Sequence, residues 1–288
     1  MRKAIVVYVV ILLMVLSAAV VGAQAPDRSQ LDPKPYDPAT EPHIDMYMGS
    51  WLESMPRHTH GSLIERDILT RGNPQNPTTK GAVLIYAGRF THATLPAHAS
   101  TVPTVLEGEQ EVLYILTGEG SVTAAGKTSE LFPGIGVLVP ENIEFVMKST
   151  GDEPLTMYLL SDPVPEGFKG SRELLVVDEN KRQFGKSNPH WVGLSKSLFN
   201  KNTGLATIGN ILTVRFDPMT FFQPHSHREG QEEVWTAVYG EIHFLLGKQI
   251  RKQPPGTAYY IPPNGKTPHA NFNVSDEMVK LFYFSTLN

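Results

Sequence analysis

The chain repeats itself at one constant interval. Residues 111–118, Glu-Val-Leu-Tyr-Ile-Leu-Thr-Gly, match residues 233–240, Glu-Val-Trp-Thr-Ala-Val-Tyr-Gly, at an offset of 122. The pair Pro133-Gly134 with the later Pro140 matches Pro255-Gly256 with Pro262 at the same offset, and Arg89-Phe90 pairs less closely with Arg215-Phe216. A fixed offset over separate motifs indicates a duplicated structural unit. We therefore expect two homologous domains within the 288 residues.

Short apolar runs separated by Gly and Pro dominate the first copy. They lie at residues 82–86, 111–116, 136–140 and 155–160, and they are rich in β-branched and aromatic side chains. Such runs are typical of strands rather than helices. The expected fold class is therefore all-β, with two barrels in tandem. Residues 173–177 form a further candidate strand, and residues 191–199 a strand or a short helix.

Three segments lie outside the two copies. Residues 1–23 begin with Arg2 and Lys3, continue as an apolar run and end in Val21-Gly22-Ala23, which is the layout of a secretory signal. Residues 24–80 are rich in proline and polar side chains, so we interpret them as an arm that wraps a neighbouring sheet. We assign residues 81–162 to the first barrel, 163–203 to a connection and 204–288 to the second barrel. The expected location is secreted or periplasmic, with an uncleaved membrane anchor as the alternative.

Charge and cysteine content exclude several functions. The formal net charge is −4, and removal of the signal would lower it to about −6. A mildly acidic body without a basic cluster argues against nucleic acid as a partner. The chain has no cysteine, so it offers neither disulfides nor thiolate metal ligands.

The second copy carries side chains that suit a metal ion. His225 and His227 are separated by one residue, so on a strand they share a face. A carboxylate near residue 233 and the imidazole of His269 would arrive from neighbouring strands. Three nitrogens and one oxygen would form a metal site with open positions.

This pattern resembles the cupin family, whose motifs read Gly-x5-His-x-His-x3-4-Glu-x6-Gly and Gly-x5-Pro-x-Gly-x2-His-x3-Asn. The opening Gly of the first motif is missing here, and the intervals 227–233 and 265–269 each hold one extra residue. The longer loop leaves Glu232 and Glu233 as alternatives, and we favour Glu233 because it alone keeps six residues before Gly240. The matching positions are His225, His227, Glu233, Gly240, Gly256, Pro262, Gly265, His269 and Asn273.

The resemblance implies two cupin barrels of the double-stranded β-helix, or jelly-roll, type. It also implies one divalent transition metal held by His225, His227, Glu233 and His269. Without thiolates the metal would be manganese, iron, nickel, copper or zinc. Gln223 lies two residues before His225 and Asn273 four residues after His269, so on a strand each shares a face with a ligand. We therefore expect their side chains to fix the orientation of the ligands.

The first copy has lost most of this set. His98 aligns with His225, Ser100 with His227 and Phe145 with His269, which leaves only His98 and Glu111. We therefore expect the first barrel to be metal-free, unless His92, Glu144 or an arm histidine substitutes. For the arm pair His58-Thr59-His60 we expect a surface or arm role, because no matching carboxylate and third histidine follow.

The family hosts many functions, so the fold alone does not decide among them. We expect an exported, metal-dependent oxidoreductase of dioxygenase type that acts on a small oxygen-rich organic molecule. The alternatives are a metal-dependent lyase or isomerase, and a non-catalytic binding protein for a sugar or organic acid. The expected partner is a small-molecule substrate or ligand, with a homo-oligomer left open, and no membrane contact after signal cleavage.

Overall fold

The computed structural model describes residues 43–185 and 192–286. The predicted signal, residues 1–23, lies outside this part. In the described part no helix has the length and apolar character needed to cross a membrane. The helical segments found there are four short 3₁₀ turns, η2 (Ile44–Tyr47), η3 (Trp51–Glu53), η4 (Glu179–Lys181) and η5 (Lys201–Thr203). The other regular elements are strands, so the prediction of an all-β fold is confirmed.

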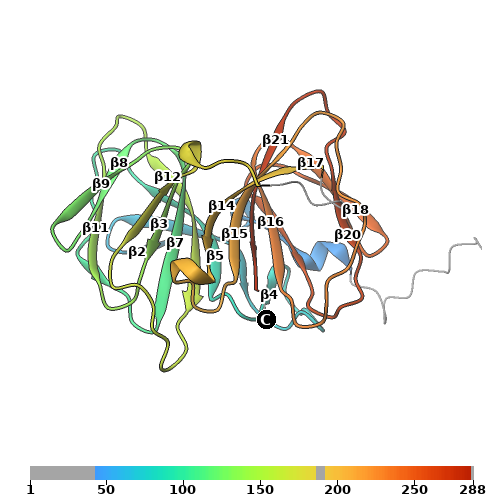
Figure 1. The fold of residues 1–288 in the computed structure, drawn as a ribbon, viewed down its shortest axis with the longest axis horizontal. Helices are drawn as coiled ribbons and strands as arrows, with labels where there is room; N and C mark the ends of the chain where they lie inside the picture. Colours follow the sequence, from blue (N-terminus) through green and yellow to red (C-terminus); the bar gives the residue numbers. More distant parts are fainter. Residues whose placement is uncertain (1–42, 186–191, 287–288) are drawn as a thin grey trace, which may run out of the picture. The chain divides into compact units, whose positions relative to one another are not determined.

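The first barrel consists of an eight-stranded and a four-stranded sheet (Figure 1). The larger sheet contains β13 (Leu175–Asp178), β10 (Ile135–Val139), β7 (Glu109–Thr117), β12 (Leu155–Pro163), β5 (Arg89–Leu95), β3 (Leu63–Arg71) and β2 (Arg57–Thr59), and β4 (Ala82–Leu84) pairs with β3. The smaller sheet contains β6 (Thr104–Val105), β11 (Glu144–Ser149), β8 (Gly120–Ala124) and β9 (Lys127–Leu131).

The second barrel repeats this arrangement with a six-stranded and a three-stranded sheet. The larger sheet contains β1 (Met48–Ser50), β19 (Thr257–Ile261), β16 (Glu233–Tyr239), β21 (Val279–Ser285), β15 (Asn210–Phe216) and β14 (Leu194–Asn200). The smaller sheet contains β18 (Gln249–Gln253), β17 (Ile242–Leu246) and β20 (His269–Phe272). The duplication expected from the sequence is thus present in the arrangement of the strands.

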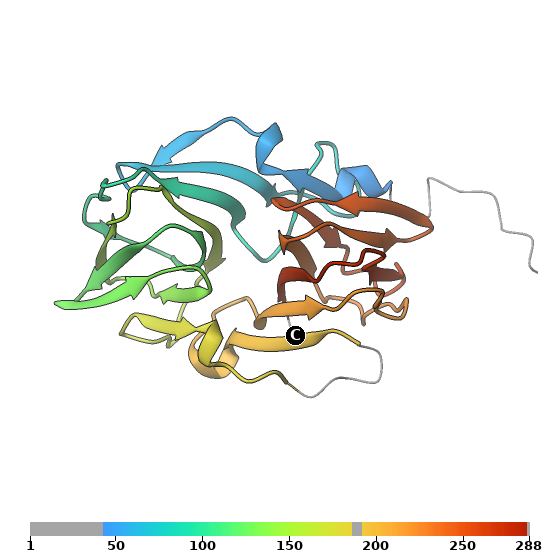
Figure 2. The same ribbon diagram turned by 90° about the horizontal axis from the view of Figure 1, so that it is seen from above.

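The two barrels exchange edge strands. β1 precedes the first barrel in sequence but pairs with β19 of the second, whereas β13 precedes the second barrel but pairs with β10 of the first. Figure 2 shows the N-terminal segment running along strands of both barrels. Residues 43–80 are therefore more than a wrapping arm, because β2 and β3 are strands of the first barrel's larger sheet.

Each repeated segment ends in a glycine for a steric reason. Gly118 and Gly240 follow β7 and β16 with φ angles of 80° and 77°, in the left-handed region that favours glycine. A Cβ at Gly118 would lie 2.5 Å from the carbonyl oxygen of Pro154. The turn that starts each hairpin therefore requires a residue without a side chain.

Aromatic side chains join the barrels into one core. Phe90 of β5 packs against Phe282 and Phe284 of β21, with ring centroids 6.0 Å and 5.3 Å apart. The Tyr158 hydroxyl donates to the carbonyl oxygen of Ala237 at 2.6 Å. A further apolar cluster, including Leu113, Val137 and Met157, fills the inside of the first barrel.

Candidate metal centre

The four candidate ligands lie on three segments of the second barrel. His225 and His227 lie in the segment between β15 and β16, Glu233 begins β16 and His269 begins β20. His225 and His269 form an antiparallel bridge in which each backbone N–H donates to the other's carbonyl oxygen, at 3.1 Å and 2.9 Å. This bridge brings the segment that carries His225 and His227 alongside β20.

The side chains converge on one point. The centroids of the His225, His227 and His269 rings lie 4.4 Å to 4.9 Å apart. The Glu233 carboxylate completes the group, with Oε2 2.6 Å from Nε2 of His227 and Oε1 3.1 Å from Nε2 of His269. The side chains of Glu233 and His269 are 1% exposed, whereas that of His227 is 21% exposed, so the group opens to solvent on the His227 side.

The donor set fits a divalent metal. The three imidazoles can each offer one nitrogen within 4.8 Å of the others. Apart from their contacts with Glu233, Nε2 of His227 and both ring nitrogens of His269 are buried and have no hydrogen-bond partner among the described residues. Three imidazoles and a carboxylate that converge with so few other partners are uncommon in a folded protein and point to a bound ion. The nature of the donors, three imidazoles and one carboxylate, suits a transition metal.

The electrostatics favour the cation-binding protonation state of Glu233 and of His225. Burial raises the pKa of the Glu233 carboxyl, but His269 and His227 outweigh it and hold that pKa well below its usual range. Burial lowers the pKa of His225, and His269 adds to that shift. Burial also opposes protonation of His227, but Glu233 more than compensates and raises the pKa of His227. Glu233 is thus an ionised carboxylate and His225 a neutral imidazole.

Of the two alternative carboxylates, Glu233 faces the histidines. Glu232 precedes it by one residue, points to the other side of the chain and is fully buried there. Its carboxylate accepts from the backbone N–H groups of residues 85–87 and from the hydroxyl of Tyr260. Burial raises the pKa of Glu232, and these donors act against the shift.

Gln223 and Asn273, the two residues expected to orient the metal ligands, make different contacts. The backbone carbonyl oxygen of Gln223 lies 2.7 Å from Nδ1 of His225. An N–H at Nδ1 would donate there and leave Nε2 as the metal-binding atom. Gln223 therefore reaches His225 through its backbone. The Asn273 amide donates to the carbonyl oxygens of residues 216, 217 and 277, so it ties a turn together instead of orienting a ligand.

Two aromatic residues hold Glu233 in place and were not anticipated. The Trp235 indole N–H donates to Oε1 of Glu233 at 2.5 Å, and the Tyr283 hydroxyl donates to Oε2 at 3.2 Å. Trp235 and Tyr283 face each other across β16 and β21, with ring centroids 4.5 Å apart. The period-two alternation does place Trp235 on the same face as Glu233, but nothing in the sequence distinguishes this role from core packing.

The sheet register corrects the alignment of the first barrel. Thr104 pairs with Phe145 as His225 pairs with His269, so Thr104 rather than His98 stands in for His225. Two residues on, Leu106 rather than Ser100 stands in for His227. His98 instead lies on the surface, 3.1 Å from Asp152. The sequence alignment failed here because it matched one histidine with another, whereas Thr104 precedes Glu111 by seven positions, close to the eight that separate His225 from Glu233.

An arginine cluster surrounds the carboxylate of the first barrel that corresponds to Glu233. The Arg89 guanidinium donates to Glu111, the counterpart of Glu233, at 2.6 Å and also contacts Glu65 at 3.4 Å. His60 completes the cluster, with Nε2 3.3 Å from Oε2 of Glu111. Its side chain is 5% exposed, so of the surface or arm role expected for this histidine the surface position is wrong. Burial lowers the pKa of His60, but Glu111 outweighs burial and raises it.

The register also corrects the counterpart of Arg89. Arg89 pairs with Ser161 and Asn210 pairs with Ser285, at equivalent positions in the two sheets. Arg89 therefore corresponds to Asn210 rather than to Arg215, which lies on the surface and binds Asp217. The second barrel thus has no arginine at this position and keeps its histidines.

Comparisons with known proteins agree with this architecture. Two segments, residues 91–161 and 212–285, match the family model of the cupin domain. The chain belongs to the cupin family and contains two cupin barrels, so the resemblance noted in the sequence is confirmed. A search of the curated proteins finds no match.

Solved structures share the fold at low sequence identity. AerE from Microcystis aeruginosa is 12% identical, with a TM-score of 0.63 over 84% of this chain and 100% of that chain. A putative glyoxylate-induced protein from Pseudomonas aeruginosa is 13% identical, with a TM-score of 0.65 over 81% of this chain and 83% of that one. A variant of oxalate decarboxylase from Bacillus subtilis is 13% identical, with a TM-score of 0.63 over 83% of this chain and 76% of that one. At these identities the likeness shows the fold alone.

Proposed function

We propose that the second barrel holds one divalent transition metal through His225, His227, Glu233 and His269. The observation that carries the proposal is the convergence of their donor atoms, several of which are buried and have, apart from one another, no hydrogen-bond partner among the described residues. A bound metal would supply Lewis-acid polarisation of a ligand oxygen at this point.

The residues around the site hold two of the proposed metal ligands in position. Trp235 and Tyr283 fix both oxygens of Glu233, and the Gln223 carbonyl fixes the ring of His225. With these groups held, binding requires little rearrangement of the protein. The partial exposure of His227 provides the side from which a ligand approaches.

We further propose that the protein is an exported oxidoreductase of dioxygenase type. Export is supported by the layout of residues 1–23. A single metal site is supported by the first barrel, where three of the four ligand positions are occupied by Thr104, Leu106 and Phe145. Oxalate decarboxylases, which share the fold, keep metal ligands in both barrels, so this pattern argues against their reaction. A one-site bicupin resembles some flavonol dioxygenases more closely.

Turnover tests the proposal. Protein loaded separately with manganese, iron, nickel, copper or zinc would be incubated with phenolic, keto-acid and sugar-acid compounds while oxygen consumption and products are measured. We expect oxygen-dependent conversion of at least one compound by the native protein and by Ser100→Ala, and none by His269→Ala. Conversion without oxygen would indicate a lyase or isomerase. Metal binding without any conversion would instead indicate a binding protein and overturn the enzymatic proposal.

A further inference from the structure

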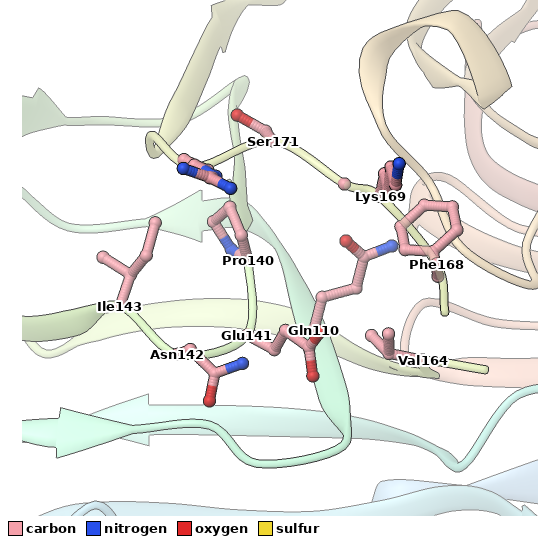
Figure 3. A pocket seen from close by; sticks show the side chains of 11 residues that line it. Gln110, Pro140, Glu141, Asn142, Ile143, Val164, Phe168, Lys169 and Ser171 are labelled. Carbon is pink, nitrogen blue, oxygen red and sulfur yellow. The ribbon is translucent and has the colours of Figure 1, made fainter. Parts of the chain in front are cut away.

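A pocket of about 510 Å³ lies on the first barrel (Figure 3), and none of the residues that line it belongs to the arginine cluster. It is bounded by the start of β7, the loop that follows β10 and the segment that follows β12. Gln110 lines it, and because side chains alternate along a strand, Gln110 points to the opposite face from Glu111. The pocket is therefore separate from the barrel interior and from the candidate metal centre. Its volume suits a small-molecule ligand.

The amide of Gln110 is held in one orientation by the protein. Gln110 is only 2% exposed, and its Nε2 donates to Oδ2 of Asp162 at 2.7 Å. Asp162 can only accept here, because its carboxylate also receives three backbone N–H groups from residues 206–208. The amide nitrogen is thus committed to Asp162, and the amide oxygen is left as an acceptor. Figure 3 shows this amide projecting into the pocket.

The charges around the pocket favour an anion. Lys169 and Arg172 both line it and are exposed, and Glu141 is the one acidic residue in its lining. None of these three side chains has an ion-pair partner within residues 43–185 and 192–286. The lining thus carries a net positive charge in a chain whose formal net charge is −4. Two free cations beside a polar pocket attract a carboxylate.

The remaining wall is largely apolar. Phe168, Val164, Ile143 and Pro140 line the pocket, and Figure 3 shows Phe168 beside the Gln110 amide. We propose that this pocket binds a small hydroxylated carboxylate of the size of a sugar acid. The carboxylate lies at Lys169 and Arg172, a hydroxyl donates to the oxygen of Gln110, and the apolar face of the ligand packs on Phe168.

Binding of D-glucuronate to the full-length protein tests this proposal. Calorimetric titration, with ligand-observed NMR for weak binding, would compare D-glucuronate with D-glucose, which lacks the carboxylate. We expect the variant Lys169→Met/Arg172→Met to weaken D-glucuronate binding about tenfold, because each exposed ion pair contributes at most about 1 kcal/mol. Lys181→Met, a change at an exposed lysine outside the pocket, should leave binding unchanged.

A variant of the second barrel separates this pocket from the metal centre. In His269→Ala, D-glucuronate should bind as in the native protein, because none of the pocket residues belongs to the second barrel. The proposal is overturned if the native protein shows no binding of D-glucuronate up to about 100 millimolar, ten times the dissociation constant of about 10 millimolar that two exposed ion pairs and one hydrogen bond would give. It is equally overturned if D-glucose binds as tightly, or if binding is lost in His269→Ala and retained in the double variant.

Discussion

Asp162 in the first barrel and Glu232 in the second make the same contact across the barrel boundary. Each buried carboxylate accepts from three consecutive backbone N–H groups in the segment that leads into the other barrel. Asp162 binds those of residues 206–208 at 2.8 Å to 3.0 Å, and Glu232 those of residues 85–87 at 2.7 Å to 3.3 Å. Asp162 lies near the end of β12 and Glu232 just before β16, so the contact recurs without a shared sequence position.

This reciprocal contact predicts a large stability cost for its removal. We expect Glu232→Gln to lower the free energy of unfolding by about 2 to 3 kcal/mol, because a charged acceptor of three N–H groups becomes a neutral one. Asp162→Asn should have a similar effect. Urea unfolding would measure both variants against Glu166→Gln, an exposed control. A loss no larger than that of the control would contradict the structural role.

Trp235 and Tyr283 should affect metal affinity through Glu233. In Trp235→Phe and in Tyr283→Phe, one carboxylate oxygen loses its donor, and we expect metal affinity to fall about tenfold. Competition with a chromophoric chelator would measure it. Tyr259→Phe is the matched control, because the Tyr259 hydroxyl binds Asn271 instead of Glu233. Equal metal affinities in all three variants would show that Trp235 and Tyr283 do not hold Glu233 in place.

The contacts of Arg89 and Arg215 predict that replacing them lowers the free energy of unfolding by different amounts. Arg89→Met would leave the buried carboxylates of Glu65 and Glu111 without their shared cation, so we expect a loss of about 3 to 5 kcal/mol of unfolding free energy. Arg215→Met breaks only a surface pair and should cost less than about 1 kcal/mol. Adding Glu65→Gln and Glu111→Gln to Arg89→Met should restore part of the loss. Equal effects of the two single changes, measured by urea unfolding, would rule out this account.

His92 should make stability depend on pH. Burial, with Arg66 adding to the effect, lowers the pKa of His92 from 6.5 to about 4. Between these values the unfolded chain binds more protons than the folded one, so stability is lost as the pH falls from about 6.5 towards 4. His92→Phe keeps an aromatic ring beside Trp51 but cannot titrate. Between pH 7 and pH 4.5 we expect the variant to lose about 2 kcal/mol less than the native protein. Identical losses would be inconsistent with a partly buried His92 that stays neutral.

The sequence predicted the features that repeat or alternate. The offset of 122 between residues 111–118 and 233–240 revealed the duplication, and period-two alternation put His225 and His227 on one face. The six residues between Glu233 and Gly240 selected the carboxylate that the structure places beside His227 and His269. These features depend on local spacing, which the sequence records directly.

Long-range pairing was beyond the reach of the sequence. The alignment placed His98 opposite His225, but only the register of β6 with β11 shows that Thr104 occupies that position. Nothing near His60 in the sequence indicates that it reaches Glu111, because the contact spans the fold. The exchange of β1 and β13 likewise depends on strands that are far apart along the chain.

The metal content of the purified protein tests the central claim most directly. Elemental analysis should find about one divalent transition metal per chain in the native protein and in Ser100→Ala. His269→Phe copies Phe145 of the first barrel and His227→Leu copies Leu106, so both variants should fall to background. Metal retained at full stoichiometry in the two histidine variants would contradict the assignment of the site to the second barrel.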